Sequence, residues 1–225
     1  MAIKAARDYY RDKKGIATGR NSGDGGGRGS GKGPRGEVIA CVSAHAAVNK
    51  ACDMMGLKLV HVGYDTTRNS SNPYQLDIQQ VKAAITPRTI MIYASAPSFP
   101  HGVIDPIAEL GKVAVRRDVA LHVDACLGGF ILPFARDHCA RLREEACAFK
   151  EAGKTAEAED LLSQAKLCDV PPFDFSVSGV TSMSVDTHKF GYSLKGASQF
   201  SSLLVLVLIL ILALALALAL ALALA

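Results

Sequence analysis

The chain has 225 residues, of which 25 are Lys or Arg and 21 are Asp or Glu, so its formal net charge is +4. This length allows one α/β domain with a substantial buried core. Because part of the modest charge lies in a glycine-rich stretch, the composition does not indicate a nucleic-acid surface.

Short apolar runs alternate along the chain with helical patterns. The runs predict buried strands over residues 37–42, 58–63, 89–95, 119–124 and 180–186. Apolar residues recur at helical spacing over residues 44–55, 77–85 and 106–118. This alternation predicts an α/β fold with a mostly parallel sheet flanked by helices and joined by right-handed crossovers.

Two predicted strand ends carry residues that suit a pyridoxal phosphate site. Lys189 follows a histidine at the end of one strand, and Asp124 ends an earlier strand. Lys189 is the candidate for a Schiff base with the cofactor, helped by partial desolvation and nearby positive charge. Asp124 is the candidate partner of the ring nitrogen, which must stay protonated while the cofactor acts as an electron sink. Taken singly, Asp124 is better explained as a turn or cap residue and Lys189 as a solvated charge.

A third strand end favours the site over those simpler explanations. Ser43 follows the strand at 37–42, and we expect it to cap a helix that begins near His45. His45 then lies at the carboxyl edge of the sheet, where open α/β sheets bind ligands. A lone histidine is more often structural, but three strand ends meet at this edge, and a planar imidazole can stack on a planar cofactor there.

Four segments carry a family resemblance: residues 43–51 (SAHAAVNKA), 98–106 (SFPHGVIDP), 121–130 (LHVDACLGGF) and 179–196 (GVTSMSVDTHKFGYSLKG). Through them the chain resembles the sphingosine-1-phosphate lyase family, within the pyridoxal-phosphate-dependent group II decarboxylase-like enzymes. The resemblance places the site in the large domain of a fold-type I enzyme. It implies that Lys189 carries pyridoxal 5'-phosphate, Asp124 pairs with its ring nitrogen, His45 stacks on its ring and His188 lies near its phosphate.

The resemblance also implies an activity, partners and a location. The activity is cleavage of a phosphorylated sphingoid base, of the sphingosine 1-phosphate type, to a fatty aldehyde and phosphoethanolamine. The other partner is a second subunit in a homodimer, and the location is the endoplasmic reticulum membrane with a cytosol-facing catalytic domain. Two alternatives stay open. One is a pyridoxal-phosphate-dependent amino-acid decarboxylase, against which the segment FPHGVIDP argues, and the other is an inactive membrane-tethered fragment.

Composition divides the chain into segments, and we expect a fragment of a longer enzyme. Residues 1–18 predict a helix of a truncated large domain. Residues 19–36 are glycine-rich and are expected to be a disordered insertion, since the P-loop-like pattern at 26–33 lacks its final hydroxyl residue. Residues 37–200 form the predicted cofactor-binding domain. A charged segment near 136–168 predicts a solvent-facing helical hairpin inserted into it.

The carboxyl-terminal tail at 203–225 contains no polar residue and ends in alternating leucine and alanine. It is long enough to cross a bilayer of about 30 Å as a helix. Because it stands where the family's catalytic sequence continues, we expect either a transmembrane helix or an artefact of the gene model.

The six cysteines show neither paired metal-ligand spacing nor the framework of a small secreted domain. We therefore expect reduced thiols and no metal site. Cys126 lies two residues after Asp124, and we expect it to be a small buried core residue.

Overall fold

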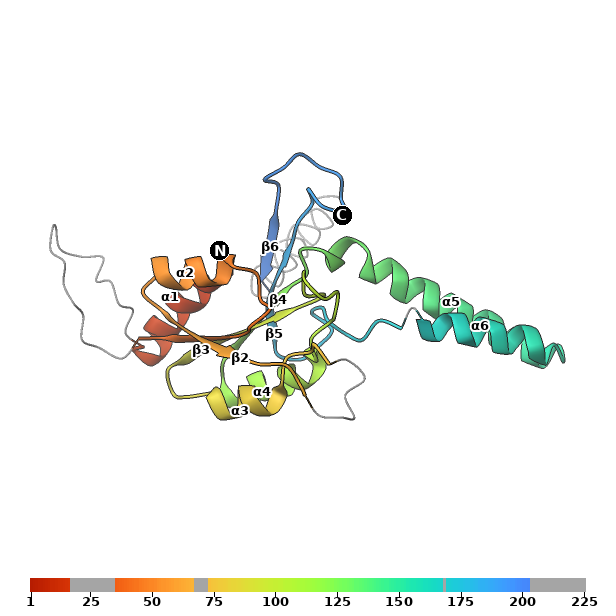
Figure 1. Ribbon diagram of the computed structural model, residues 1–225, viewed down its shortest axis with the longest axis horizontal. Helices are drawn as coiled ribbons and strands as arrows, with labels where there is room; N and C mark the ends of the chain where they lie inside the picture. The colour runs from red at the N-terminus through yellow and green to blue at the C-terminus, as the bar shows by residue number, and fades with distance from the viewer. Residues whose placement is uncertain (17–34, 67–72, 168, 203–225) are drawn as a thin grey trace, which may run out of the picture.

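The computed structural model describes residues 1–16, 35–66, 73–167 and 169–202. Its centre is a six-stranded sheet in the order β2-β1-β3-β4-β5-β6 (Figure 1). The strands are β1 (Glu37–Cys41), β2 (Lys58–Val62), β3 (Thr89–Ser95), β4 (Ala120–Asp124), β5 (Val180–Val185) and β6 (Gln199–Ser202). Strands β1 to β5 are parallel, and β6 pairs antiparallel with β5. The predicted mostly parallel α/β fold is confirmed, whereas β6 was not predicted.

Helices cover both faces of the sheet. They are α1 (Ala2–Lys14), α2 (Ala47–Met54), α3 (Ile78–Ala84), α4 (Ile107–Arg117), the 3₁₀ helix η1 (Gly128–Phe130), α5 (Leu132–Glu151) and α6 (Thr155–Leu167). Figure 1 shows α1 and α2 on one side of the sheet and α3 and α4 on the other. This arrangement gives three layers, with the sheet in the middle.

Alternate side chains along the strands pack into two apolar layers, one on each face of the sheet. Ala120 packs toward α1 and α2, whereas its neighbour Leu121 packs toward α3 and α4. All five residues of β1 and all seven of β3 are buried. Strands buried on both faces read as continuous apolar runs, which explains why these segments were visible in the sequence.

The register of the parallel strands brings their carboxyl ends to one edge. Asp124 at the end of β4 lies opposite Ser95 of β3 and Ser184 of β5. The segments after β1, β3, β4 and β5 therefore leave the sheet at the same edge. This is the edge on which the predicted site residues stand.

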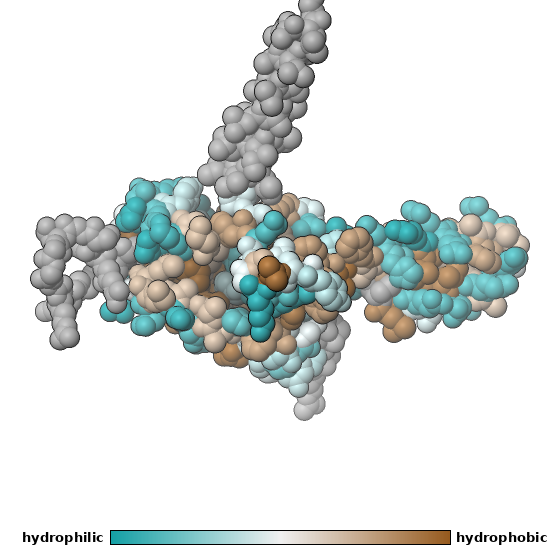
Figure 2. All heavy atoms as spheres, turned by 90° about the horizontal axis from the view of Figure 1, so that it is seen from above, coloured by the Kyte–Doolittle hydropathy of each residue, from teal (hydrophilic) through white to brown (hydrophobic). Residues whose placement is uncertain are grey.

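The charged segment after β4 forms a long helical hairpin of α5 and α6. It projects away from the sheet in Figure 1, and Figure 2 shows mostly hydrophilic residues over it with apolar residues between them. Its two helices bury small and apolar side chains against each other: Cys139, Leu142 and Ala146 from α5, and Ala158 and Ala165 from α6. Helix α5 begins at Leu132, a few residues before the predicted start.

Two predicted segments fall outside the described residues. The tail at 203–225 does so entirely, and the glycine-rich stretch at 19–36 does so for all but its last two residues. Among the helices that are described, none has the length and hydropathy required for a membrane span.

Two local expectations are wrong. Ser43 does not cap α2, because its hydroxyl donates to Cys41 Sγ at 3.2 Å and the helix begins only at Ala47. The expectation of reduced thiols fails for Cys139, which is disulfide-bonded, while Cys41, Cys52, Cys126 and Cys147 are free.

Candidate active site

Asp124 lies at the end of β4 with only 7% of its surface exposed. Its Oδ2 accepts a hydrogen bond of 2.7 Å from the Tyr93 hydroxyl, and its Oδ1 accepts bonds of 3.1 Å from the Ser184 hydroxyl and 3.1 Å from the Cys126 backbone N–H. Burial and the neighbouring Asp124 carboxylate raise the pKa of Tyr93 well above its ordinary value, so this phenol stays a donor. Asp124 is thus held by neutral donors.

A buried histidine stands behind Asp124 on the same face of the sheet. His122 places Nδ1 2.9 Å from the Ser182 hydroxyl and Nε2 3.2 Å from the Ser184 hydroxyl. Its ring centroid is 5.0 Å from that of Tyr93. Burial lowers the pKa of His122 to about 4, against an opposing effect of Asp124, so the ring is neutral at pH 7.

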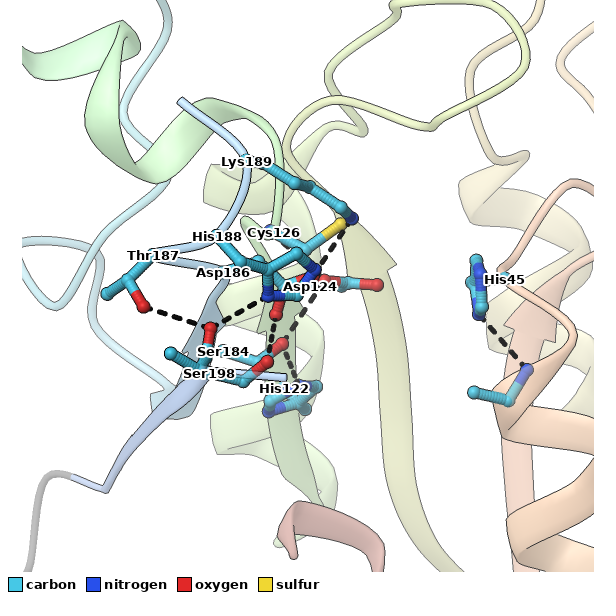
Figure 3. Close-up of polar contacts among 12 residues, drawn as sticks. His45, His122, Asp124, Cys126, Ser184, Asp186, Thr187, His188, Lys189 and Ser198 are labelled. Carbon is cyan, nitrogen blue, oxygen red and sulfur yellow. Dashed lines mark hydrogen bonds and ion pairs between the residues drawn. The ribbon is translucent and has the colours of Figure 1, made fainter. Parts of the chain in front are cut away.

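Lys189 follows β5 and is partly buried, with 29% of its side chain exposed. Its Nζ lies 2.9 Å from Asp186 Oδ2, and Asp186 also accepts a 2.6 Å hydrogen bond from the Ser198 hydroxyl (Figure 3). Burial lowers the pKa of Lys189, but Cys126 and Asp186 outweigh burial and raise it. The expectation of nearby positive charge is therefore wrong, because the charged partner that holds this amine is a carboxylate.

Cys126 is not the core residue that the sequence predicted. Its side chain is only partly buried and interacts with the Lys189 amine, which reaches toward it in Figure 3. Burial, with Asp124, raises the pKa of this thiol to about 11. Because the Cys126 backbone N–H also bonds Asp124, this residue links the lysine to the buried carboxylate.

His45 lies at the same edge but apart from Asp124 and Lys189, since β3 stands between β1 and β4 (Figure 3). It is exposed, and its Nδ1 accepts a 3.2 Å hydrogen bond from the Ala47 backbone N–H. Its ring packs edge-on against Phe99, with centroids 5.4 Å apart. The imidazole is thus held in a defined orientation at the end of β1.

His188 lies in the loop that follows β5, and its ring contacts a later residue of the same loop. Its Nδ1 lies 2.8 Å from the Ala197 carbonyl oxygen, and its Nε2 lies 3.8 Å from Asp186 Oδ2. His188 and Lys189 therefore both contact the Asp186 carboxylate.

The sequence did not single out Tyr93, His122, Ser184 or Asp186 as site residues. A signal for His122 was present, since it shares a strand face with Asp124 two residues later. The strand pairing that puts Tyr93 and Ser182 opposite His122, however, depends on the order and register of three strands.

A pocket of about 280 Å³ adjoins this network. Its polar lining includes Tyr93, His122 and Ser184, and its apolar lining comes from the first residues of α1, from α2 and from Phe200 of β6. The buried polar network therefore borders open space on the α1 and α2 side of the sheet.

A family profile described as the pyridoxal-dependent decarboxylase conserved domain matches residues 35–150. The chain is 40% identical over 198 residues to a sphingosine-1-phosphate lyase of Dictyostelium discoideum, covering 88% of this chain and 28% of that protein. It is 41% identical to sphingosine-1-phosphate lyase 1 of Mus musculus over 198 residues, covering 88% of this chain and 26% of that protein. The chain thus spans little more than a quarter of the length of these relatives.

Solved structures are similar to this chain as well. A sphingosine-1-phosphate lyase of Burkholderia pseudomallei K96243 superposes with a TM-score of 0.60 at 34% identity, covering 87% of this chain and 33% of that chain. A glutamate decarboxylase of Lactobacillus brevis superposes with a TM-score of 0.57 at 19% identity, covering 88% of this chain and 35% of that chain, which shows the shared fold alone. Since the profile covers just over half of its residues, the chain belongs to the pyridoxal-dependent decarboxylase family, whose cofactor is pyridoxal phosphate.

Proposed function

We propose that this chain carries the cofactor site of a carbon–carbon lyase that cleaves phosphorylated sphingoid bases to a fatty aldehyde and phosphoethanolamine. The observation that carries the proposal is the buried Asp124 carboxylate, held by neutral donors, with Lys189 adjoining it through Cys126. The similarity to sphingosine-1-phosphate lyases supports the choice of substrate.

The described residues fit pyridoxal phosphate by their chemistry. Asp124 is a buried acceptor that suits a protonated ring nitrogen, and Lys189 supplies an amine at the same edge of the sheet. We assign the covalent attachment to Lys189, the ring nitrogen to Asp124, one ring face to His45 and the phosphate to His188. When bound, the cofactor supplies a sink for the electron pair of the carbon–carbon bond that breaks.

The chain's own residues set the resting protonation states of the lysine and the thiol. Asp186 holds the Lys189 amine as an ammonium ion at 2.9 Å, and Ser198 orients Asp186. The amine must lose a proton before it attacks an aldehyde, so leaving Asp186 is part of its activation. Cys126 stays a neutral thiol at pH 7 because its pKa is raised to about 11.

An amino-acid decarboxylase is not favoured as a second function. The decarboxylase structure compared above shares only 19% of its residues with this chain, against 34% for the bacterial lyase. Product analysis separates the two activities directly. A phosphorylated sphingoid base should yield a long-chain aldehyde, whereas carbon dioxide from an amino acid without any aldehyde would contradict the proposal.

Retention of the cofactor tests the site itself. The full chain in mild detergent is incubated with pyridoxal phosphate, reduced with borohydride and digested, and mass spectrometry locates the fixed cofactor. We expect the label on Lys189 and no label in Lys189→Ala, while Lys195→Ala serves as a matched control on an exposed lysine of the same loop. A folded wild-type chain that retains no cofactor would favour the inactive-fragment alternative.

We also propose that the site is completed in a homodimer. Large apolar side chains are exposed in the segments that follow β3, β4 and β5: Phe99, Phe130, Phe134, Phe190 and Tyr192. Exposed apolar groups gathered at one edge suit burial against a partner. Light scattering should give twice the monomer mass and Phe134→Glu should lower it; a monomeric wild type at micromolar concentration would contradict the proposal.

The location follows from the family resemblance alone, and we propose the endoplasmic reticulum membrane with the cytosol-facing catalytic domain. The apolar composition of residues 203–225 supports membrane attachment. Fractionation of cells that express the full chain should recover it with microsomes, accessible to added protease. Recovery in the soluble fraction would overturn this proposal.

A further inference from the structure

A chain of hydrogen bonds leads to Asp124 from the interior of the sheet. It runs from Ser182 to His122, from His122 to Ser184 and from Ser184 to Asp124, over contacts of 2.9, 3.2 and 3.1 Å. Ser182 is buried and His122 is only 2% exposed, so water does not compete freely for these groups. The direction of each bond follows from the number of hydrogens that each group carries.

The hydrogen bond between Ser184 and Asp124 has only one possible direction. Its hydroxyl has one hydrogen, and that hydrogen is donated to Asp124 Oδ1. Nε2 of His122 must then donate to the Ser184 oxygen, so Nε2 carries the ring hydrogen. In a neutral ring, Nδ1 is left without a hydrogen and accepts from the Ser182 hydroxyl.

The opposite tautomer leaves the chain broken. With the hydrogen on Nδ1, Nε2 would accept the single hydrogen of Ser184. The Ser184 oxygen would then face Asp124 Oδ1 at 3.1 Å without a hydrogen between them. A buried acceptor without a donor is costly, so the contacts select the Nε2–H tautomer. A doubly protonated ring is disfavoured because the ring is buried.

The same count shows where Asp124 has room for another donor. A carboxylate has about four acceptor positions, two on each oxygen. Ser184 and the Cys126 backbone N–H take those on Oδ1, and Tyr93 takes one on Oδ2. The Cys126 thiol, a weak donor, also hydrogen-bonds this carboxylate. Apart from the thiol, one position on Oδ2 is left for a stronger donor.

We propose that His122 is a positioning residue whose Nε2–H holds the Ser184 hydroxyl on Asp124 Oδ1 and so keeps the open position on Oδ2 for the ring N–H of the cofactor. The role toward the cofactor rests on the proposed function. The tautomer itself rests only on contacts within this chain.

Nitrogen NMR of the full chain without cofactor tests the tautomer. With ¹⁵N-labelled histidine side chains, long-range ¹H–¹⁵N spectra distinguish a protonated from an unprotonated ring nitrogen, and the spectrum of His122→Phe identifies the His122 signals by difference. We expect protonated Nε2 and unprotonated Nδ1. Protonated Nδ1 in a neutral ring overturns the proposal, whether or not the chain binds pyridoxal phosphate.

Ser182→Ala provides a second variant in case His122→Phe does not fold. It removes the donor to Nδ1 with little change in volume. The lost hydrogen bond shifts the Nδ1 signal and so identifies the His122 ring. We expect the Nε2–H tautomer to persist, because the Ser184 hydroxyl that selects it still donates to Asp124. A ring protonated on Nδ1 in this variant contradicts the assigned direction of the chain.

Cofactor binding tests the positioning role. By absorbance titration with pyridoxal phosphate, we expect His122→Phe to bind roughly tenfold more weakly, as for loss of one hydrogen bond supporting a charged group. His122→Gln, whose amide N–H has a similar reach, should restore most of the affinity. His138→Phe, on the exposed side of α5, is the matched control and should bind like the wild type.

The outcomes separate the two proposals. Wild-type affinity in folded His122→Phe overturns the positioning role while the proposed function stands. A wild-type chain without Lys189-dependent cofactor binding refutes the proposed function, and the cofactor part of this inference fails with it. The NMR measurement then still decides the tautomer.

Discussion

Two buried carboxylates lie at opposite ends of the parallel strands, Glu37 at the amino end and Asp124 at the carboxyl end, and they are stabilised in different ways. Glu37, at the start of β1, is 1% exposed and lies 3.2 Å from the Lys58 amine and 3.0 Å from the Arg88 guanidinium. Asp124, at the end of β4, is 7% exposed and receives only neutral donors; within the described part of the chain no lysine or arginine forms an ion pair with it.

The difference distinguishes a charge that is compensated inside the fold from the charge that we assign to the cofactor site. Burial raises the pKa of Glu37, but hydrogen bonds from Thr86, Arg88 and Lys58 outweigh burial and hold its pKa below the ordinary value. Its charge is thus compensated inside the fold. The charge of Asp124 is stabilised by hydrogen bonds alone, so it stays available to a cationic group that enters the site.

Neutralising Asp124 should have the largest effect on activity. In Asp124→Asn the charge that supports a protonated ring nitrogen is lost, so we expect aldehyde formation to fall roughly a hundred- to thousandfold. Stability should change little, because the variant also removes an uncompensated buried charge. Product assays and urea unfolding measure the two effects. An unchanged rate in a variant that retains cofactor would contradict the assigned role.

Asp105 is a third buried carboxylate, and it too has no cationic partner among the described residues. It accepts from the backbone N–H groups of Ser95 at 2.8 Å and Leu76 at 3.0 Å, but burial raises its pKa to about 6. Because the folded pKa exceeds the unfolded value, its contribution to stability grows as the pH falls from about 7 to 4.

The expected gain from Asp105 is on the order of 3 kcal/mol at most. Urea unfolding at several pH values measures it as the difference between the wild type and Asp105→Asn, whose side chain does not titrate. The difference should change steadily over this range. A constant difference would show that Asp105 does not take up a proton there.

Glu37→Gln should destabilise the fold without affecting cofactor binding. It removes the charge that pairs with Lys58 and Arg88, and since both cations are partly exposed we expect a loss of about 1–3 kcal/mol in the free energy of unfolding. The loss should shrink as the pH falls below the ordinary carboxyl range and vanish once the wild-type carboxylate is also protonated, because a depressed folded pKa contributes stability only while the group is charged. Weaker cofactor binding with unchanged stability would show that Glu37 serves the cofactor site and does not stabilise the fold.

The smallest effect is expected for Lys58→Met. The Lys58 side chain is 59% exposed, so solvent screens its ion pair, and Arg88 still compensates Glu37. We expect a loss below about 1 kcal/mol in urea unfolding. A loss as large as that of Glu37→Gln would show that Lys58 alone compensates the buried charge.

The parts of the site that could be predicted are those that stand at strand ends. Lys189, Asp124 and His45 each follow a run of apolar residues, and parallel strands bring such ends to one edge whatever the details of packing. The Lys189–Asp186 ion pair and the contact with Cys126 could not be predicted, because they depend on how the loop after β5 folds back.

Strands β1 to β5 and helices α2 to α4 could be predicted from the amino-acid sequence, because apolar periodicity is a local property that does not depend on neighbouring elements. Which side chains contact one another depends on the folded arrangement of the strands. His122 reaches Ser182 and Ser184, and Asp124 reaches Tyr93, through the register of β3, β4 and β5. Shifting one strand by a single residue would turn these groups to the other face of the sheet, so long-range pairing determines the chemistry of the site.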